Sequence, residues 1–136
     1  MYTNYDAIDA VYRFLTDKLA DVGINIPIHR VVRPVDDLTE YIVINSLSVN
    51  TGVLQETRVN INVHVPNEQN RTKGKPDNSQ PNFKRLKELT SVIRNLAHDK
   101  NEGDVFFYVE WDRLINEPET KNYFSNIRVE TYLLNE

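Results

Sequence analysis

The sequence predicts one α+β domain in which two amphipathic helices pack against a mainly antiparallel sheet. Two segments repeat apolar residues at helical spacing, and five have the alternation or the β-branched and aromatic composition of strands. Their order is helix, three strands, helix, two strands, and the short connections between most strands favour antiparallel pairing. A chain of 136 residues has the size of a single domain with one core, and no change in composition divides residues 1–136.

Each predicted helix has one apolar face. The first begins at a capping residue, Thr3 or Asn4, and ends before Gly23, a residue that suits the position after a helix. The residues of its apolar face are Ile8, Val11, Tyr12, Leu15, Leu19 and Val22. The second helix opens near Pro81 and ends before residues 101–104. The residues of its buried face are Phe83, Leu86, Leu89, Thr90, Ile93 and either Leu96 or Ala97.

The predicted strands differ in their expected burial. Residues 26–32 contain Pro27, whose missing N–H group suits an edge strand. Residues 41–45 are apolar on both faces, so we expect a central strand that is covered on both sides. The last two strands are expected at residues 105–111 and 122–134, and turns at residues 34–37 and 116–119.

The strand at residues 57–65 determines where the core lies. Val59, Ile61, Val63 and Val65 alternate with polar residues, so all four face the same way. A shift of one residue would bury Arg58 and three other polar side chains, which specifies the register strongly. We expect the four apolar side chains to be buried together with residues of both helices, namely Leu15, Leu19, Leu86 and Ile93.

Composition excludes several kinds of site and partner. The chain has no cysteine, which rules out disulfides, thiolate nucleophiles and cysteine-based zinc sites. Its net charge of −4 argues against broad phosphate binding, which needs a surplus of lysine and arginine on one face. No apolar run approaches the ~20 residues that span a bilayer, and the first residues do not have the pattern of a secretory signal. We therefore expect no membrane partner and no direct binding of nucleic acid.

No motif for catalysis, a cofactor or a metal is found in the sequence. His29, His64 and His98 lack the helical spacing of a metal site, although His29 and His64 lie on strands that could be neighbours. They are interpreted as surface histidines, with a metal site as the alternative. Gly74 and Lys75 lie between a strand and a helix, but the pattern of a phosphate-binding loop is absent around them. We predict a protein that is not an enzyme and has no catalytic, cofactor-binding or metal-binding residue.

Residues 66–80 form an unusually long polar connection. Every residue in this segment is polar, charged, glycine or proline, so none can contribute to a core. We expect a mobile loop that is poorly ordered in the isolated chain. Arg71, Lys73 and Lys75 are either solvated cations or part of an arm that becomes ordered on a neighbouring subunit, and they are the candidate residues of a subunit-interface loop.

Aromatic residues are concentrated in the last two strands. Alternation places Phe106 and Tyr108 on one face of their strand, and Phe107 and Trp111 on the other. Either helices cover both faces of the sheet, or one face is an interface, where aromatic residues are enriched. The candidate interface aromatics are Phe107, Trp111, Phe124 and Tyr132.

The order of these elements resembles that of the tail-completion proteins of long-tailed phages, which include tail terminators, head-to-tail joining proteins and minor tail proteins. The matching stretches are residues 8–22, 41–65, 83–96 and 105–134, which is nearly the whole chain. They correspond to an N-terminal helix, a three-stranded segment, a second helix and a final hairpin, with a long polar insertion in between. The match lies in the order of the elements, their length and their pattern of apolar and polar residues, without a diagnostic motif.

The resemblance implies a structural protein of the virion that is present in the host cytoplasm during assembly. Proteins of this family form rings, typically hexameric, that cap the tail tube and meet the head connector. The implied partners are other copies of the chain, the tail tube protein and head connector proteins, with DNA only passing through the ring. The family has no catalytic residues, so the resemblance assigns no site residue here.

The alternative is a domain that binds a small ligand or a peptide. Such a domain could be an enzyme whose site is assembled from residues far apart in the sequence, because a fold alone does not determine function. The mass of the chain in solution separates the two hypotheses. A monomer at high concentration with an enclosed apolar pocket favours ligand binding, whereas self-association favours a ring subunit.

Overall fold

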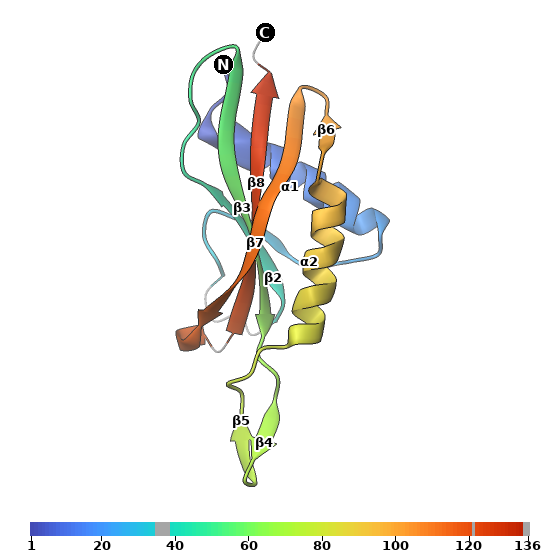
Figure 1. Ribbon diagram of the computed structural model, residues 1–136, viewed down its shortest axis with the longest axis vertical. Helices are drawn as coiled ribbons and strands as arrows, with labels where there is room; N and C mark the ends of the chain where they lie inside the picture. Colours follow the sequence, from blue (N-terminus) through green and yellow to red (C-terminus); the bar gives the residue numbers. More distant parts are fainter. Residues whose placement is uncertain (35–38, 121, 135–136) are drawn as a thin grey trace.

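The computed structural model describes residues 1–34, 39–120 and 122–134, which fold as an α+β domain as predicted (Figure 1). The helices are α1 (Asn4–Asp21), α2 (Phe83–Ala97) and the short 3-10 helix η1 (Pro118–Thr120). The strands are β1 (Ile28–Arg30), β2 (Tyr41–Ser46), β3 (Leu54–Pro66), β4 (Asn70–Thr72), β5 (Lys75–Asp77), β6 (Lys100–Glu102), β7 (Val105–Glu117) and β8 (Asn122–Leu134).

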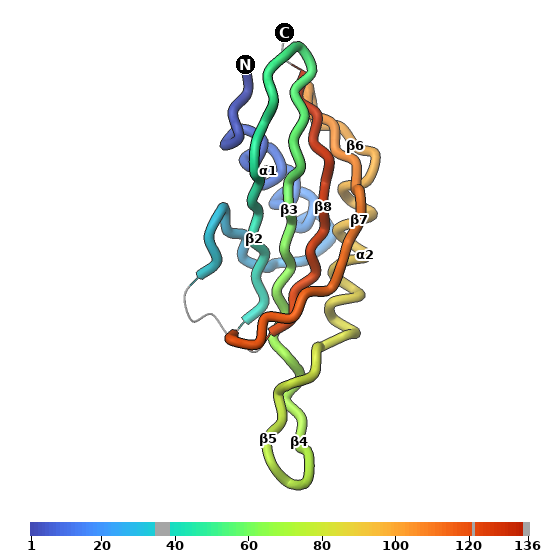
Figure 2. The backbone as a smooth tube through the Cα atoms, turned by 60° about the vertical axis from the view of Figure 1, so that its left-hand side comes forward, coloured from blue at the N-terminus to red at the C-terminus, as the bar shows by residue number. Residues whose placement is uncertain are grey.

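Six strands form the main sheet, in the order β1-β2-β3-β8-β7-β6. The long strands β3 and β8 pair antiparallel over their whole length and form its centre. β1 lies at one edge, as Pro27 just before it predicted. It runs parallel to β2, whereas the other pairs of the sheet are antiparallel. The short helix η1 follows the end of β7 and precedes the start of β8. This connection lies close to where β2 begins (Figure 2).

The ends of α1 follow from local chemistry. The hydroxyl of Thr3 accepts a hydrogen bond from the N–H of Asp6 at 3.2 Å, and the Asp6 carboxylate accepts one from the Thr3 N–H at 2.7 Å. This capping box satisfies N–H groups that the helix leaves free, and its hydrogen bonds lower the pKa of Asp6. After the helix, Gly23 adopts φ +77°, and the N–H of Ile24 donates to the Leu19 carbonyl at 2.9 Å.

α2 starts one residue after its cap, Asn82, whose side-chain oxygen accepts a hydrogen bond from the Arg85 N–H at 3.2 Å. The Arg85 guanidinium also donates to both carboxylate oxygens of Glu40, at 2.7 and 3.0 Å, and so ties the helix to the residue before β2. Phe83, in the first turn, is exposed rather than buried. This corrects the prediction that it belongs to the buried face of the helix.

The core lies between the sheet and the two helices, where the sequence placed it. Val59, Ile61, Val63 and Val65 of β3 are buried, and they belong to one cluster with Leu15, Leu19, Leu86 and Ile93. The predicted register of β3 is therefore confirmed. The first four residues of β2, residues 41–44, are buried on both faces, also as predicted.

Both helices cover the same face of the main sheet. α1 packs on β1, β2 and β3, and α2 packs on β3, β7 and β8. We call this side of the sheet the inner face and the opposite side the open face. Figure 2 shows the sheet in front of both helices. Among the described residues, no helix lies on the open face, so the aromatic strands are not covered by helices on both sides.

Three elements differ from the prediction. Residues 66–80 contain the two-stranded hairpin of β4 and β5 instead of a loop without regular structure. β6 extends the sheet beyond β7 and was not predicted. β3 and β7 are longer than expected, because the pairs that they form with β8 continue past the strongly apolar residues. Of the turn predicted at residues 34–37, residues 35–37 lie outside the described residues.

Candidate interaction surfaces

A β-bulge in β7 decides which way Trp111 points. The register with β8 shifts between Val109, which pairs with Val129, and Trp111, which pairs with Arg128. Simple alternation puts Trp111 on the same face as the buried Val109. The extra residue, Glu110, rotates the following part of the strand, so that Trp111 shares the open face with Arg128.

Trp111 contacts two guanidinium groups on the open face. The guanidinium carbons of Arg128 and Arg113 are 4.7 and 4.9 Å from the centre of its ring. Cations at this distance from an indole face are attracted by its electrons and hold the ring in place. The Arg128 Nε also donates to the side-chain oxygen of Asn60 at 3.3 Å, which fixes the stack to β3. Trp111 and Arg128 are half-buried and Arg113 is exposed. Tryptophan and arginine are among the residue types most enriched in binding hot spots.

A network of asparagine side chains lies beside this stack. The Asn60 amide donates to Asn45 at 2.9 Å, and the Asn126 amide donates to Asn62 at 2.6 Å and to Asn60 at 3.3 Å. The side-chain oxygen of Asn126 is buried without a hydrogen-bond partner. These bonds cross from β2 through β3 to β8, so they make the middle of the open face a connected polar surface.

Three stacked rings cover the part of the open face near η1. The ring of His64 lies 4.5 Å from that of Tyr41 on one side and 4.5 Å from that of Phe124 on the other. His64 is buried, which corrects its interpretation as a surface histidine, and its burial lowers the pKa of the imidazole. Burial also raises the pKa of Tyr41. Phe124, a candidate interface residue, is half-buried at the edge of this stack.

The remaining two candidate aromatics have different positions. Tyr132 lies on the open face, and its hydroxyl donates to the Glu130 carboxylate at 2.7 Å, which raises the pKa of Tyr132 to about 12. Phe107 is buried in the core, with its ring 4.8 Å from that of Phe14. Phe107 therefore stabilises the fold and is not available at a surface, contrary to its prediction as an interface residue.

We call residues 66–80 the arm, because the hairpin of β4 and β5 projects away from the sheet and helices (Figure 1). Its turn has Lys73 at φ +54° and Gly74 at φ +76°, the two positive angles of the tight turn preferred in two-residue hairpins. Across the hairpin, the Thr72 hydroxyl donates to Asp77 at 2.6 Å. This bond, with two from Ser79, lowers the pKa of Asp77 to about 2.

The base of the arm is anchored by backbone and side-chain bonds. The Glu68 N–H donates to the Gln80 carbonyl at 2.9 Å, and the Asn67 amide donates to the Asn78 carbonyl at 2.8 Å. The predicted interface residues Arg71, Lys73 and Lys75 are all exposed on the hairpin beyond this base. The structure thus brings the three cations together at one end of the molecule.

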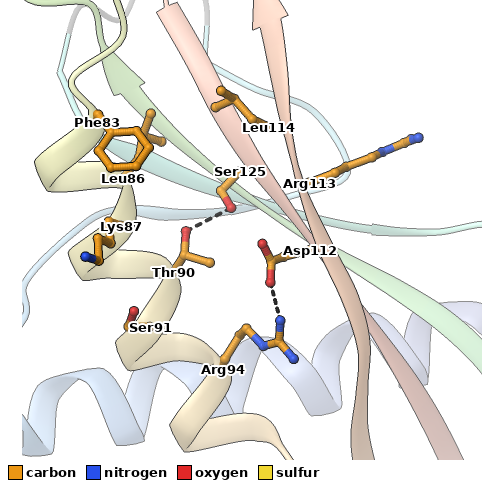
Figure 3. Close-up of a pocket in the computed structure, with 10 residues that line it drawn as sticks. All are labelled: Phe83, Leu86, Lys87, Thr90, Ser91, Arg94, Asp112, Arg113, Leu114 and Ser125. Atoms are coloured by element: carbon orange, nitrogen blue, oxygen red, sulfur yellow. Dashed lines mark hydrogen bonds and ion pairs between the residues drawn. The ribbon is translucent and has the colours of Figure 1, made fainter.

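A groove of about 360 Å³ separates α2 from β7 (Figure 3). Leu86 and Ser125 lie within it, and Phe83 and Leu114 lie at its mouth with 67% and 53% of their surfaces exposed. β6 pairs only with the beginning of β7, residues 105–107, and leaves the edge of β7 beside the groove without a strand partner in the described part of the chain.

Polar groups cross the floor and side of this groove. The Thr90 hydroxyl donates to the Ser125 hydroxyl at 2.8 Å, and Arg94 forms an ion pair with Asp112 (Figure 3). These contacts join α2 to β8 and β7, so the groove is a rigid feature rather than a gap between independent elements. Its walls combine apolar side chains with Lys87, whereas Arg113 points away from it (Figure 3).

The histidines do not form a common site. β1 and β3 lie on opposite sides of β2, so the ring of Tyr41 separates His29 from His64. His98 accepts a hydrogen bond from the Val109 N–H at 3.2 Å and so stabilises the edge of β7. Residues 1–34, 39–120 and 122–134 contain no group of three His, Asp or Glu side chains that could hold a metal ion. No helix among them is long and apolar enough to cross a membrane.

Comparisons of the chain with protein-family models, with curated proteins and with solved structures found no significant match.

The sequence indicated some of these surfaces and missed others. Alternation in residues 59–65 correctly placed the core face of β3. The contact of Trp111 with two arginines was not predictable, because nothing local marks Glu110 as the bulged residue. The arm did carry a weak signal: Gly74 in the middle of a polar connection is typical of a hairpin turn, although Lys73 is not a residue that favours its positive φ.

Proposed function

We propose that this chain is a structural subunit that assembles with copies of itself into a ring, and that the ring completes the tail tube of a long-tailed phage and joins it to the head. The observation that supports this proposal most is the open face of the sheet. No helix of the described residues covers it, and its aromatic and guanidinium groups are held in place by cation–π contacts and hydrogen bonds. Preorganised side chains reduce the entropy cost of association, so such a face suits a protein interface.

Within this face, Trp111 has the strongest expected contribution to binding. A partner that covers Trp111, Arg113 and Arg128 excludes water from an aromatic ring that its cation–π contacts already hold in place. Phe124 and Tyr132 extend the same surface along β8 in opposite directions. Together they fit a partner with a flat apolar patch and acidic residues that meet the arginines.

The arm suits a second contact in the same assembly. Arg71, Lys73 and Lys75 project away from the sheet, and the chain as a whole has 20 acidic against 16 basic residues. An acidic region of a neighbouring copy is therefore a suitable partner for the tip of the arm. The hydrogen bonds at the base of the arm keep its direction fixed, so the cost of ordering it on a partner is small.

Replacing residues 69–79 with a short Gly-Ser linker is expected to weaken assembly without affecting the fold. Loop closure depends only weakly on loop length, at about 0.6 kcal/mol for each doubling, so the thermal midpoint should change little. Thermal denaturation and sedimentation velocity measure the two effects. As a matched control, the triple substitution of Arg71, Lys73 and Lys75 by Gln keeps the hairpin and removes its charge. Normal assembly of both variants would reduce the arm to a passive connector, and loss of stability would mean that the arm packs on the domain.

Deletion of the gene from the genome that carries it tests the function itself. If the chain completes tails, electron microscopy of the lysate should show separate heads and tails, and expression of the intact chain should restore joined particles. Joined, infectious particles in the absence of the gene would contradict the proposal. So would a genomic position without any tail genes, since these genes are usually clustered.

The groove between α2 and β7 favours the second candidate function, a peptide-binding domain. It has an apolar mouth, polar groups on its floor and an adjacent unpaired strand edge, a combination that binds extended segments in known peptide-binding domains. This alternative requires a chain that remains monomeric at high concentration. Light scattering over a range of concentrations distinguishes it from self-assembly.

A further inference from the structure

The connection between β2 and β3 is an exposed apolar loop. Leu47 and Val53 are 84% and 72% exposed, and Leu54 is exposed beside them at the start of β3. We call residues 47–54 the apolar loop; they contain no charged residue. Connections of this kind are normally polar, so a group of large exposed apolar side chains marks an interaction site.

The apolar loop has a fixed shape. The side-chain oxygen of Asn50 accepts a hydrogen bond from the Glu56 N–H at 2.7 Å, and the buried Gln55 amide donates to the Asn50 carbonyl at 2.9 Å. The Gln55 oxygen accepts from the Tyr2 N–H at 2.7 Å, which ties the loop to the beginning of α1. The loop is therefore a preorganised projection, and its docking carries little further cost in backbone entropy.

The loop and the groove lie in opposite halves of the molecule. Figures 1 and 2 show the β2–β3 connection at the end that carries both termini, whereas the arm and the start of α2, where Phe83 lies, are towards the other end. The loop of one molecule is too far from its own groove to enter it. Any contact between these two surfaces therefore joins different copies of the chain.

We infer that the apolar loop of one copy docks into the groove between α2 and β7 of the next copy. This inference rests on the proposed self-assembly and names the surfaces that carry it. Leu47 and Val53 can cover the exposed side chains of Phe83 and Leu114, and the loop brings no charge that would lose its hydration in the groove. Each partner covers a large exposed apolar group of the other, which lowers the apolar area in contact with water.

Charge supports the same orientation. Four charged residues line the groove, but Arg94 is paired with Asp112 and Arg113 points away from it (Figure 3). Lys87 is therefore the cation beside the groove that has no ion pair in the described part of the chain. The charged residue that follows the apolar loop is Glu56, which is exposed. In the docked arrangement Glu56 of one copy lies near Lys87 of the next. Two copies that met groove to groove would bring their Lys87 side chains together instead.

A contact between two different surfaces repeats from head to tail. Such an interface generates a ring when the rotation between neighbours closes, and a filament when it does not. A twofold dimer, in contrast, uses the same patch on both copies. In a head-to-tail contact, a variant with a damaged loop can still pair with a variant with a damaged groove. A twofold interface does not predict this result.

Phe83→Asp and Val53→Asp test this contact from its two sides. Both residues are exposed, and Asp is favourable in the first turn of α2, so both variants should fold. Each is expected to weaken self-association by about tenfold or more, because a charge enters an apolar contact. Val32→Asp is the matched control: Val32 is 69% exposed, close to the 72% of Val53, and lies outside both surfaces, so this variant should assemble normally.

The decisive measurement is the mass of an equimolar mixture of Phe83→Asp and Val53→Asp by sedimentation velocity. The first variant keeps an intact loop and the second an intact groove, so the mixture should form a heterodimer and nothing larger. Purely monomeric mixtures, assembly of either variant like the wild type, or a wild type that stays monomeric at all concentrations would overturn the inference. The gene deletion tests tail completion separately. Tail completion can therefore be refuted while the loop–groove contact is confirmed, and the contact can be refuted while tail completion is confirmed.

Discussion

Ile61→Ala is expected to lower the free energy of unfolding by about 2–5 kcal/mol. Ile61 is fully buried in the central strand β3, where it pairs with Ile44 of β2 and Ile127 of β8, and both partners are fully buried as well. Truncation removes apolar contacts and leaves a cavity. Strands on both sides and helices above restrict the collapse that would refill this cavity, so we expect a value in the upper part of the range.

Urea denaturation of the wild type and the variant measures this loss as a shift of the midpoint at constant slope. Val32→Ala is a suitable control, because Val32 is 69% exposed, lies outside the loop and the groove, and its truncation should change the free energy of unfolding by less than about 0.5 kcal/mol. If the midpoint of Ile61→Ala did not move, the side chain could not be packed in the core, and the register of β3 would be wrong.

The register of β3 was predictable because alternation carries the information within the strand itself. In a strand with four apolar residues on one face, a shift of one residue would turn all four away from the core. The helix boundaries were predictable for a similar reason, since Thr3 and Gly23 act through bonds to residues within one turn. In both cases, local chemistry and tertiary packing require the same conformation, so the sequence alone is sufficient.

The departures arise where tertiary contacts override the local pattern. β6 is a run of exposed residues without any strand signal, and it is extended only because β7 offers a free edge after the left-handed turn at Asp99. The arm has no apolar residue, and its hairpin is held by backbone pairing, a tight turn and the Asp77 bonds. The absence of apolar residues correctly excluded this segment from the core, but it did not exclude regular structure.

The surfaces were less predictable than the fold. The aromatic residues of the last strands marked the sheet as unusual, but the bulge at Glu110 moved Trp111 to the open face and left Phe107 in the core. The groove depends on the angle between α2 and β7, which no short segment specifies. A surface formed by elements far apart in the sequence can be identified only when the packing of these elements is known.

Acidification is expected to destabilise the protein through His64. The imidazole lies between Tyr41 and Phe124 and is buried, which lowers its pKa from the ordinary value of 6.5. The Glu117 carboxylate and Asn122 act in the opposite direction and Arg33 in the same direction, but desolvation is the largest effect. The folded chain therefore holds His64 neutral at a pH where the unfolded chain already binds a proton.

The sign of the pH dependence follows from proton linkage. Between the folded-state pKa and 6.5, the unfolded state binds more protons, so the free energy of unfolding rises with pH and is lost on acidification. Each unit by which the pKa is lowered corresponds to about 1.4 kcal/mol. Above this window, near neutral pH, the full contribution of neutral His64 to the free energy of unfolding is present. Below the folded-state pKa, both states are protonated at His64 and no further loss comes from it.

His64→Gln isolates this contribution, because it removes the titrating group from both states. Urea denaturation at about pH 7.5 and pH 5 should show a larger loss of stability for the wild type than for the variant, whatever the variant costs at neutral pH. Every other ionisable group is the same in the two proteins, so its contribution cancels in the difference. Equal losses in the two proteins would mean that His64 takes up its proton in the folded state without cost, and the ring stack would then have to be open to water.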